Sequence, residues 1–471
     1  MIDSNTTQPR ALLVAGLSGG SGKSVVAVGL IAALAGRGLR LTPFKKGPDY
    51  IDAGWLALAA GRPCYNLDPF LMEADVIAAS FERGLKDGEM TVVEGNRGLY
   101  DGVDVSGSCS SAELSVQLGV PVLLVVDCTK ATRTIAALVL GCLHFDRRVR
   151  ICGVVLNRIA GARHRQIVTE AIEHYTGVPV LGVLPKLKEN IFSQRHLGIT
   201  PFQEHASASE TVERLAALMA EHLDLDRILA LASCRIPAGG FPGPPAVSQS
   251  RPAAQQKVRI GVIKDAAFQF YYRENLEALI EAGAALVEIN ALSEERLPEI
   301  DALYIGGGFP ETSAGLLAAN RSFRQSVKQG IDQGLPVYAE CGGLIYLGRS
   351  IVLEGEEYPL VGVFDIRFAL SRKPQAHGYT ALEVRKPNPF YPLGLRIKGH
   401  EFRYSTIEQW PGESEGLVFA MERGVGFMDR RDGLLYKNAL ALYTHIHALG
   451  TPEWAPAMVA KARECRSVRK G

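Results

Sequence analysis

A chain of 471 residues is too long for one ordinary hydrophobic core, so its length predicts two or three domains. Its 51 Lys and Arg residues nearly balance its 50 Asp and Glu residues, which argues against nucleic acid or an anionic membrane surface as a partner. No run approaches the roughly 18 apolar residues of a membrane span, and the 8 cysteines form no Cys-x-x-Cys pair. We therefore expect a cytoplasmic protein without a disulfide framework or structural zinc.

Short apolar runs alternate with helix-patterned segments through the first half of the chain. The strand-like runs cover residues 11–17, 90–95, 120–127, 149–157 and 178–185, and the helix-patterned segments cover residues 25–38, 134–145 and 163–175. Unbroken runs of Val, Leu and Ile are typical of strands buried on both faces of a sheet. The sequence therefore predicts a parallel α/β domain over residues 1–232.

A glycine-rich stretch, residues 16–24, connects the first predicted strand to the first predicted helix. In a phosphate-binding loop at this place, backbone N–H groups turn toward phosphate oxygens, a lysine neutralises the outer phosphates and a serine ligates Mg²⁺. We predict that the nucleotide is bound by Gly19, Gly20, Ser21, Gly22, Lys23 and Ser24, with Ser24 also a metal ligand. The loop is a variant, because five residues rather than four separate Gly16 from Gly22. The alternative is a glycine-rich turn with a surface lysine.

Residues 44–52 crowd two lysines and two carboxylates into one short segment. This mixture suits a Mg²⁺ and anion site better than a helix, and we predict Lys45 as an anion-binding residue and Asp49 as a metal ligand. The alternative is an exposed charged loop. Glu94 ends an apolar strand, from which a carboxylate reaches a metal directly or through water, so it is predicted as a further ligand. An acid that only caps the next turn is the alternative.

Asn157 follows another predicted strand, where its side chain is placed to read the edge of an adenine. A plain turn asparagine is the alternative. Residues 233–256 are rich in Pro, Gly and Ser and predict a linker. A second α/β series follows over residues 257–471. Its strand-like runs cover residues 258–265, 285–290, 301–308 and 335–343, and its helix-patterned segments cover residues 272–282 and 323–333.

Cys341 stands between an apolar strand and a helix-patterned segment, flanked by glycines. At such a turn a thiol is exposed near a helix N-terminus, which favours the nucleophilic thiolate. A nucleophilic cysteine needs a base, and His445 and His447 near the C-terminus are the two candidates. Gly307 and Gly308 follow another strand and are predicted to present backbone N–H groups to an oxyanion, with an ordinary tight turn as the alternative.

Five segments together resemble the cobyrinic acid a,c-diamide synthase family: the glycine-rich loop, KKGPDYID at 45–52, EGNRGLYDG at 94–102, VVDCTKATRTIAA at 125–137 and VVLNR at 154–158. The resemblance implies a dethiobiotin-synthetase-like P-loop domain coupled to a class I glutamine amidotransferase domain with a flavodoxin-like sheet. It also implies ATP, Mg²⁺ and L-glutamine, with Cys341 as the nucleophile. By the Tyr-x-His ending of the family, His445 is favoured as the base, although His447 would point the same way in a strand.

The resemblance implies a tetrapyrrole substrate amidated at its a and c acetate groups, with cobyrinic acid as the first expectation. Asn96 and Arg97 stand where Val-Met is usual, and residues 445–448 depart from the usual ending, so siroheme and nickel-sirohydrochlorin are alternative substrates. Cobyric acid synthase shares both domain types but matches the 45–52 and 94–102 segments less well. A P-loop ATPase switch would leave Cys341 without a purpose. Residues 399–405 also resemble a family segment of unassigned role, and the sequence leaves open whether the chain forms a homodimer.

Overall fold

The computed structural model describes residues 9–187, 194–195, 198–205, 207–235 and 257–470. The chain divides into two compact units, Met1–Gln249 and Ser250–Gly471, which are described separately. The predicted linker, residues 233–256, lies outside the described residues except for its first three positions. There the backbone N–H groups of Cys234 and Arg235 donate to the carbonyls of Pro9 and Gly119, so these positions pack against the first unit.

The first unit is built on a seven-stranded sheet of order β3-β2-β4-β1-β5-β6-β7, in which every neighbouring pair is parallel. This confirms the predicted parallel α/β sheet. The strands are β1 (Arg10–Gly16), β2 (Leu41–Lys46), β3 (Tyr65–Leu67), β4 (Met90–Gly98), β5 (Val122–Asp127), β6 (Ile151–Ile159) and β7 (Val180–Pro185). The strands β2 and β3 were not among the predicted runs.

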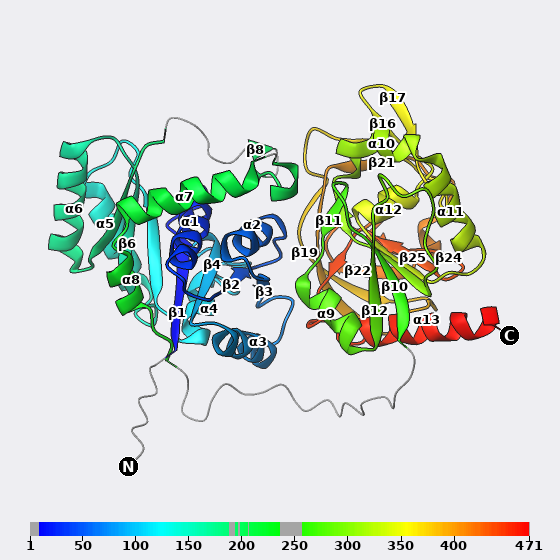
Figure 1. Cartoon of the computed structure of the whole chain (residues 1–471), viewed down its shortest axis with the longest axis horizontal. Coiled ribbons are helices and arrows are strands. Elements are labelled where there is room, and N and C mark those ends of the chain that lie inside the picture. The colour runs from blue at the N-terminus through cyan, green and yellow to red at the C-terminus, as the bar shows by residue number, and fades with distance from the viewer. Residues whose placement is uncertain (1–8, 188–193, 196–197, 206, 236–256, 471) are drawn as a thin grey trace, which may run out of the picture. The chain divides into compact units, whose positions relative to one another are not determined.

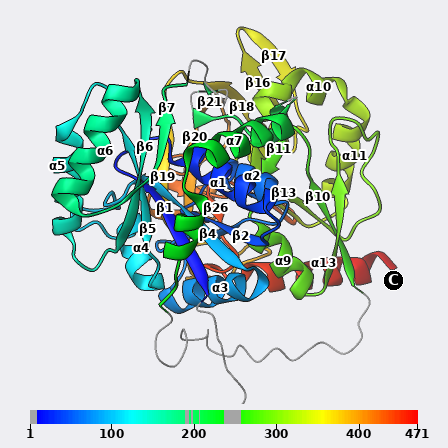
Figure 2. The same ribbon diagram turned by 60° about the vertical axis from the view of Figure 1, so that its left-hand side comes forward.

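Helices cover both faces of this sheet, as Figures 1 and 2 show. On one face α1 packs against α2 and α7, while α3 and α4 lie against β2 and β4 on the other. The helices are α1 (Lys23–Gly36), α2 (Ile51–Ala60), α3 (Ala74–Asp87), α4 (Ser111–Leu118), α5 (Arg133–Phe145), α6 (Ala162–Thr176), α7 (Ala208–His222) and α8 (Leu225–Leu231). A two-residue pair, β8 (Gln194–Arg195) with β9 (Gly198–Ile199), and the 3-10 turn Phe202–Glu204 complete the unit.

The second unit has a main sheet of order β12-β10-β13-β15-β25-β24. Its first five strands are parallel and follow the 2-1-3-4-5 order of flavodoxin-like folds, while β24 pairs antiparallel at the edge. Their bounds are β10 (Val258–Ile263), β12 (Ala284–Ile289), β13 (Ala302–Ile305), β15 (Val337–Glu340), β24 (Leu434–Tyr436) and β25 (Ala439–Leu442). The observed order agrees with the flavodoxin-like sheet that the resemblance implied.

Alternate residues of these strands point into two cores. Leu303, Ile305 and Ala339 pack with α11 and α12, whereas Tyr304 and Tyr338 pack with α9 and α13. This alternation decides which side chains of β15 can meet across the sheet. The helices are α9 (Arg273–Glu281), α10 (Ala314–Ala319), α11 (Arg321–Asp332), α12 (Gly342–Leu347) and α13 (Trp454–Lys470), with 3-10 turns at Pro310–Ser313 and Ser414–Gly416.

Smaller sheets complete the second unit. One has the order β23-β22-β19-β20-β26, another the order β17-β16-β18-β21, and β11 pairs with β14. The strands are β11 (Phe268–Phe270), β14 (Gly307–Gly308), β16 (Ser350–Leu353), β17 (Glu356–Pro359), β18 (Arg367–Leu370), β19 (Ala376–Val384), β20 (Arg396–Arg403), β21 (Ser405–Gln409), β22 (Phe419–Arg423), β23 (Arg431–Asp432) and β26 (His445–Ile446). The segment 399–405 therefore lies in β20 and β21, and β20 pairs with the strand that carries His445.

Among the residues that the structure describes, no helix combines the length and the apolar composition needed to cross a membrane.

Candidate functional site

The glycine-rich loop runs from the end of β1 to the start of α1. Gly20 and Gly22 have positive φ values of 76° and 92°, a backbone region in which glycine carries no side-chain penalty. Ser21 Oγ donates to the Ser18 carbonyl over 2.8 Å and accepts from the Ser18 N–H over 3.0 Å, which closes the loop on itself. A Cβ added at Gly19 or Gly20 would meet nothing within 4 Å, so this side of the loop is open to a ligand.

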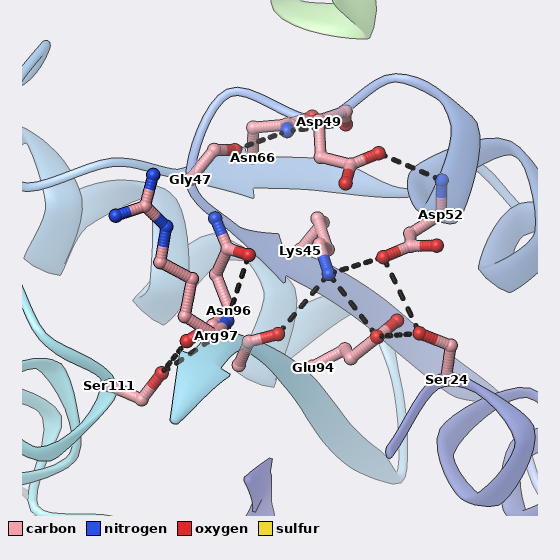
Figure 3. A network of polar contacts seen from close by, with 11 residues as sticks. Ser24, Lys45, Gly47, Asp49, Asp52, Asn66, Glu94, Asn96, Arg97 and Ser111 are labelled. Atoms are coloured by element: carbon pink, nitrogen blue, oxygen red, sulfur yellow. Dashed lines mark hydrogen bonds and ion pairs between the residues drawn. The ribbon is translucent and has the colours of Figure 1, made fainter. Parts of the chain in front are cut away.

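Lys45 lies at the centre of a polar network that includes Ser24, the last residue of this loop, as Figure 3 shows. Its Nζ is 2.7 Å from Asp52 Oδ2, 3.2 Å from Glu94 Oε1 and 3.2 Å from the Gly95 carbonyl oxygen. Burial alone would lower the pKa of Lys45, but the surrounding carboxylates raise it, so the side chain is a cation. Ser24 Oγ donates to Glu94 Oε1 over 2.7 Å. The structure thus brings together the predicted residues Ser24, Lys45 and Glu94.

The segment 45–52 is neither an exposed loop nor free of helix. Lys45 is fully buried at the end of β2 and residues 47–50 lie outside any helix, but Ile51 and Asp52 already belong to the first turn of α2. The physical reason is a local cap: Asp49 Oδ1 accepts a hydrogen bond from the Asp52 N–H over 2.9 Å and satisfies one of the free donors of the helix start. Asn66 Nδ2 donates to the carbonyls of Gly47 and Asp49 and fixes the turn.

The carboxylates of this network fit a divalent cation. Burial, followed by the charge of Asp52, raises the pKa of Glu94 to about 7 and that of Asp49 to about 6. Glu94 Oε2 is buried without a hydrogen-bond partner among the described residues. In the described part of the chain no three His, Cys, Asp or Glu side chains converge as a metal cage. The unpartnered Glu94 oxygen, beside Asp52 and Ser24, fits Mg²⁺, which binds one or two carboxylates together with phosphate oxygens and water.

Asn157 lies at the end of β6, opposite Asp127 of β5. Its Nδ2 donates to the Ser21 carbonyl over 2.9 Å, and its Oδ1 accepts from the Arg158 N–H. A Cβ at Gly22 would lie 2.2 Å from the same Nδ2, so the asparagine and the glycine fit against each other. The side chain therefore supports the phosphate-binding loop, and its reading of an adenine edge stays a prediction.

Cys341 occupies the sharp turn between β15 and α12. Its φ is 47° and its ψ is −98°, a conformation that L residues rarely adopt and that is typical of strained functional turns. The turn needs its glycines, because a Cβ at Gly343 would lie 2.5 Å from the Ile305 carbonyl and one at Gly342 would lie 3.0 Å from the Gly308 nitrogen. The elbow and the Gly307–Gly308 turn, which are distant in sequence, therefore adjoin.

His445 approaches this elbow from β26. Its Nδ1 is 3.5 Å from Glu340 Oε2, and a Cβ at Gly307 would lie 2.4 Å from its Cε1. Burial would lower the pKa of His445, but hydrogen bonding and charge from Cys341, followed by Glu340, raise it to about 10. The structure thus brings Cys341, His445 and Gly307 into one site.

His447 faces a different acid. It is fully buried, its Nε2 lies 3.7 Å from Glu274 Oε1, and its ring packs 4.6 Å from that of Tyr272. Among the contacts that the structure records for His447, none is to Cys341. The geometry therefore favours His445 as the base.

Three residues of these sites were missed as functional candidates. Asp52 was visible in the charged segment, and Glu340 directly precedes the cysteine, but neither had a sequence signal that separated it from a structural acid. His400 of β20 stacks on His445 with ring centroids 4.9 Å apart. In the sequence, the only sign of a role for His400 was that residues 399–405 resemble a family segment whose role is unassigned.

Comparisons with known proteins agree with this division of the chain. Residues 12–197 match the family described as a CobQ/CobB/MinD/ParA nucleotide binding domain, and residues 259–453 match a CobB/CobQ-like glutamine amidotransferase domain. Over most of its length the chain is also similar to proteins that are each named cobyrinate a,c-diamide synthase.

The relative from Magnetococcus marinus is 43% identical over 94% of this chain and 95% of its own length. That from Archaeoglobus fulgidus is 39% identical over 96% of this chain and 97% of its own. That from Caldanaerobacter subterraneus subsp. tengcongensis is 36% identical over 93% of this chain and 95% of its own. The chain is thus a glutamine-dependent amidating ligase that uses ATP, and it belongs to the cobyrinate a,c-diamide synthase family.

Proposed function

We propose that this chain converts the a and c acetate groups of a tetrapyrrole, cobyrinic acid, into amides, with ATP as the energy source and glutamine as the nitrogen donor. The observation that carries the proposal is the presence in one chain of two different sites. One is a phosphate-binding loop above the Lys45 network, and the other is a strained cysteine turn beside a histidine. The names of the relatives, cobyrinate a,c-diamide synthase, support the choice of substrate.

The first unit would activate the acid. A carboxylate does not react usefully with ammonia because oxide is a poor leaving group, whereas an acyl phosphate loses phosphate readily. Transfer of the γ-phosphoryl group of ATP to an acetate oxygen gives ADP and the acyl phosphate, and ammonia then displaces phosphate and loses a proton. Lys23 and the open N–H groups of the loop would hold the transferring phosphoryl group.

The acidic network would hold the metal that accompanies the nucleotide. Ser24, Asp52 and Glu94 present oxygens around one point, with Asp49 beside them as the cap of α2. Bound there, Mg²⁺ would neutralise charge on the phosphate oxygens during transfer. Lys45 would lower the cost of ionising Glu94 and Asp52, the two acids it contacts.

The second unit would release the nitrogen. Cys341 would attack the side-chain amide of glutamine, and the Gly307–Gly308 turn beside it would face the oxyanion. His445 would give its proton to the leaving ammonia, and water would then hydrolyse the thioester to glutamate. Because ammonium is not nucleophilic, the ammonia needs a route to the acyl phosphate that shields it from protonation.

Purified protein incubated with ATP, Mg²⁺, glutamine and cobyrinic acid tests the proposal. The expected products are a monoamide and a diamide, identified by the mass change of replacing each hydroxyl with an amino group. Parallel reactions with siroheme and nickel-sirohydrochlorin test the alternative substrates.

The alternative substrates were suggested partly by Asn96 and Arg97, which stand where Val-Met is usual in the family. Arg97 is exposed, with a φ of 52°, and Ser111 Oγ accepts from the neighbouring Asn96 N–H. Amidation of siroheme or nickel-sirohydrochlorin but not of cobyrinic acid would overturn the choice of substrate. A protein that hydrolyses ATP but amidates none of the three would favour the ATPase-switch alternative.

A further inference from the structure

Glu340 is a buried acid that the mechanism above does not use. It ends β15 directly before Cys341, and its side chain is only 1% exposed. Because side chains alternate along a strand, Glu340 points to the same face as Tyr338, away from Ala339. A carboxylate buried this deeply is costly unless it is paired or hydrogen-bonded.

The contacts of the Glu340 carboxylate place it beside the His445 ring. Its Oε1 accepts from the Ile446 N–H over 3.2 Å, and its Oε2 accepts from the Tyr304 hydroxyl over 3.2 Å. The same Oε2 is 3.5 Å from His445 Nδ1. One carboxylate therefore holds both the backbone of β26 and one side of the His445 ring.

This arrangement matches a general requirement of nucleophile and base pairs. An imidazole that takes a proton from a nucleophile with one ring nitrogen works best when a third group holds the proton on the other nitrogen. With Nδ1 facing Glu340, the Nε2 atom of His445 is left for Cys341.

We propose that Glu340 is the positioning residue for His445, fixing its ring orientation and stabilising the imidazolium that faces the thiolate of Cys341. The inference rests on the proposed glutaminase function of this site. It assigns the third member of a Cys–His–Glu arrangement to the residue next to the nucleophile itself.

Other titratable groups lie beside His445 or beside Glu340. Cys341 lies on the elbow, Tyr304 on β13 contacts the same carboxylate, and His400 on β20 stacks on the ring. Burial lowers the pKa of His400 well below its usual value, so this neighbour is neutral. Beyond the end of β26, His447 pairs with Glu274 of α9. Glu340 is thus the acid that the structure places on the catalytic ring.

The test compares Glu340→Gln with Glu274→Gln, a matched loss of charge at the acid beside the other histidine. Glutamine hydrolysis and amidation with ammonium chloride are measured for both variants in the full-length protein. We expect Glu340→Gln to lower kcat for glutamine hydrolysis by about 10²- to 10⁴-fold with KM within about threefold, as expected when the base loses its orienting acid. Ammonia-supported amidation should stay at the wild-type rate, and Glu274→Gln should keep most of the glutaminase activity.

A second readout separates positioning from a structural role. Without the charge of Glu340, the His445 imidazolium loses its counter-ion and stabilises the thiolate less well, so alkylation of Cys341 by iodoacetamide at neutral pH should slow by about tenfold. Glu340→Asp, which keeps the charge, should alkylate faster and hydrolyse glutamine faster than Glu340→Gln.

Wild-type glutaminase activity in Glu340→Gln, an unchanged alkylation profile or a larger loss in Glu274→Gln would each overturn the inference. Its failure is distinct from failure of the proposed function. If Cys341→Ala abolishes glutamine hydrolysis while Glu340→Gln does not, only the role of Glu340 is wrong. If Cys341→Ala itself stays active, the glutaminase assignment is wrong.

Discussion

The two candidate sites both bury charge, but they balance it differently. At the end of the phosphate-binding loop, Lys45 faces both Asp52 and Glu94, with Asp49 close by. These three acids outnumber Lys45 and Lys23, the lysines whose charges act on them. Beside the cysteine turn, His445 faces one carboxylate and one thiol. In our proposal the first site gains from a divalent cation that arrives with the nucleotide, whereas the second carries its own partners. Substitutions that change one charge should therefore affect the two sites differently.

The largest expected effect is on the activity of the Cys341 site. In Cys341→Ala, glutamine hydrolysis and glutamine-dependent amidation should fall by at least about 10³-fold, because no thioester can form. Amidation with ammonium chloride should continue, since the first unit keeps its site. Glutamate release and product masses measure the two activities. The control Cys465→Ala, a cysteine of α13, should leave both unchanged.

At the Lys45 network, loss of the lysine charge should mainly lower the stability of the first unit. Lys45→Met removes the nearest counter-charge of buried Glu94 and partly buried Asp52, so we expect a loss of about 3–5 kcal/mol in the free energy of unfolding of the first unit. ATP-dependent amidation should fall with it. Urea unfolding measures the change, and Lys86→Met, which breaks an exposed pair with Glu82, is the control at under about 1 kcal/mol. Equal stability of the two variants would show that the network is not ionised as described.

A smaller effect is expected from crowding the base without changing any charge. In Gly307→Ala the new Cβ would lie 2.4 Å from His445 Cε1, so the ring must shift. A displacement of this size should lower kcat for glutamine hydrolysis by about 10- to 100-fold and leave ammonia-supported amidation intact. Gly416→Ala, where a Cβ meets nothing within 4 Å, is the control. Wild-type kinetics in Gly307→Ala would place the working position of His445 elsewhere.

The smallest expected effect is the pH dependence of Mg²⁺ affinity at the Lys45 network. Because burial and Asp52 raise the pKa of Glu94 to about 7, the carboxyl holds a proton below that pH and releases it above. The apparent Mg²⁺ affinity in ATP-dependent amidation should therefore rise by about tenfold from pH ~6 to pH ~8. Glu94→Gln should remove most of this dependence. Equal pH slopes in the two proteins would exclude Glu94 as a ligand.

The parts of the molecule that could be predicted are those in which local sequence decides the structure. The unbroken apolar runs of β1, β4, β5 and β6 are buried on both faces, and the glycine-rich loop and the cysteine turn follow strands directly. Each of these features is encoded within about ten neighbouring residues.

The features that escaped prediction depend on contacts between distant segments. The half-buried strands β19, β20 and β22 lack long apolar runs, and their pairing brings His400 onto His445. Likewise, the meeting of Glu340 with His445 requires both the alternation of β15 and the place of β26, which no motif spacing shows. Asp49 caps the start of the helix, and Asp52 contacts Lys45. Composition does not show which of these two similar acids takes which place.

The central claim is that phosphate chemistry in one unit is coupled to nitrogen release in the other. Glutamine labelled with ¹⁵N in its side-chain amide, supplied with ATP, Mg²⁺ and cobyrinic acid at neutral pH in excess unlabelled ammonium, tests it most directly. The account predicts ¹⁵N in the new amides, with one ADP formed for each amide. Unlabelled amides from the wild-type protein, or labelled amides without ATP consumption, would contradict it.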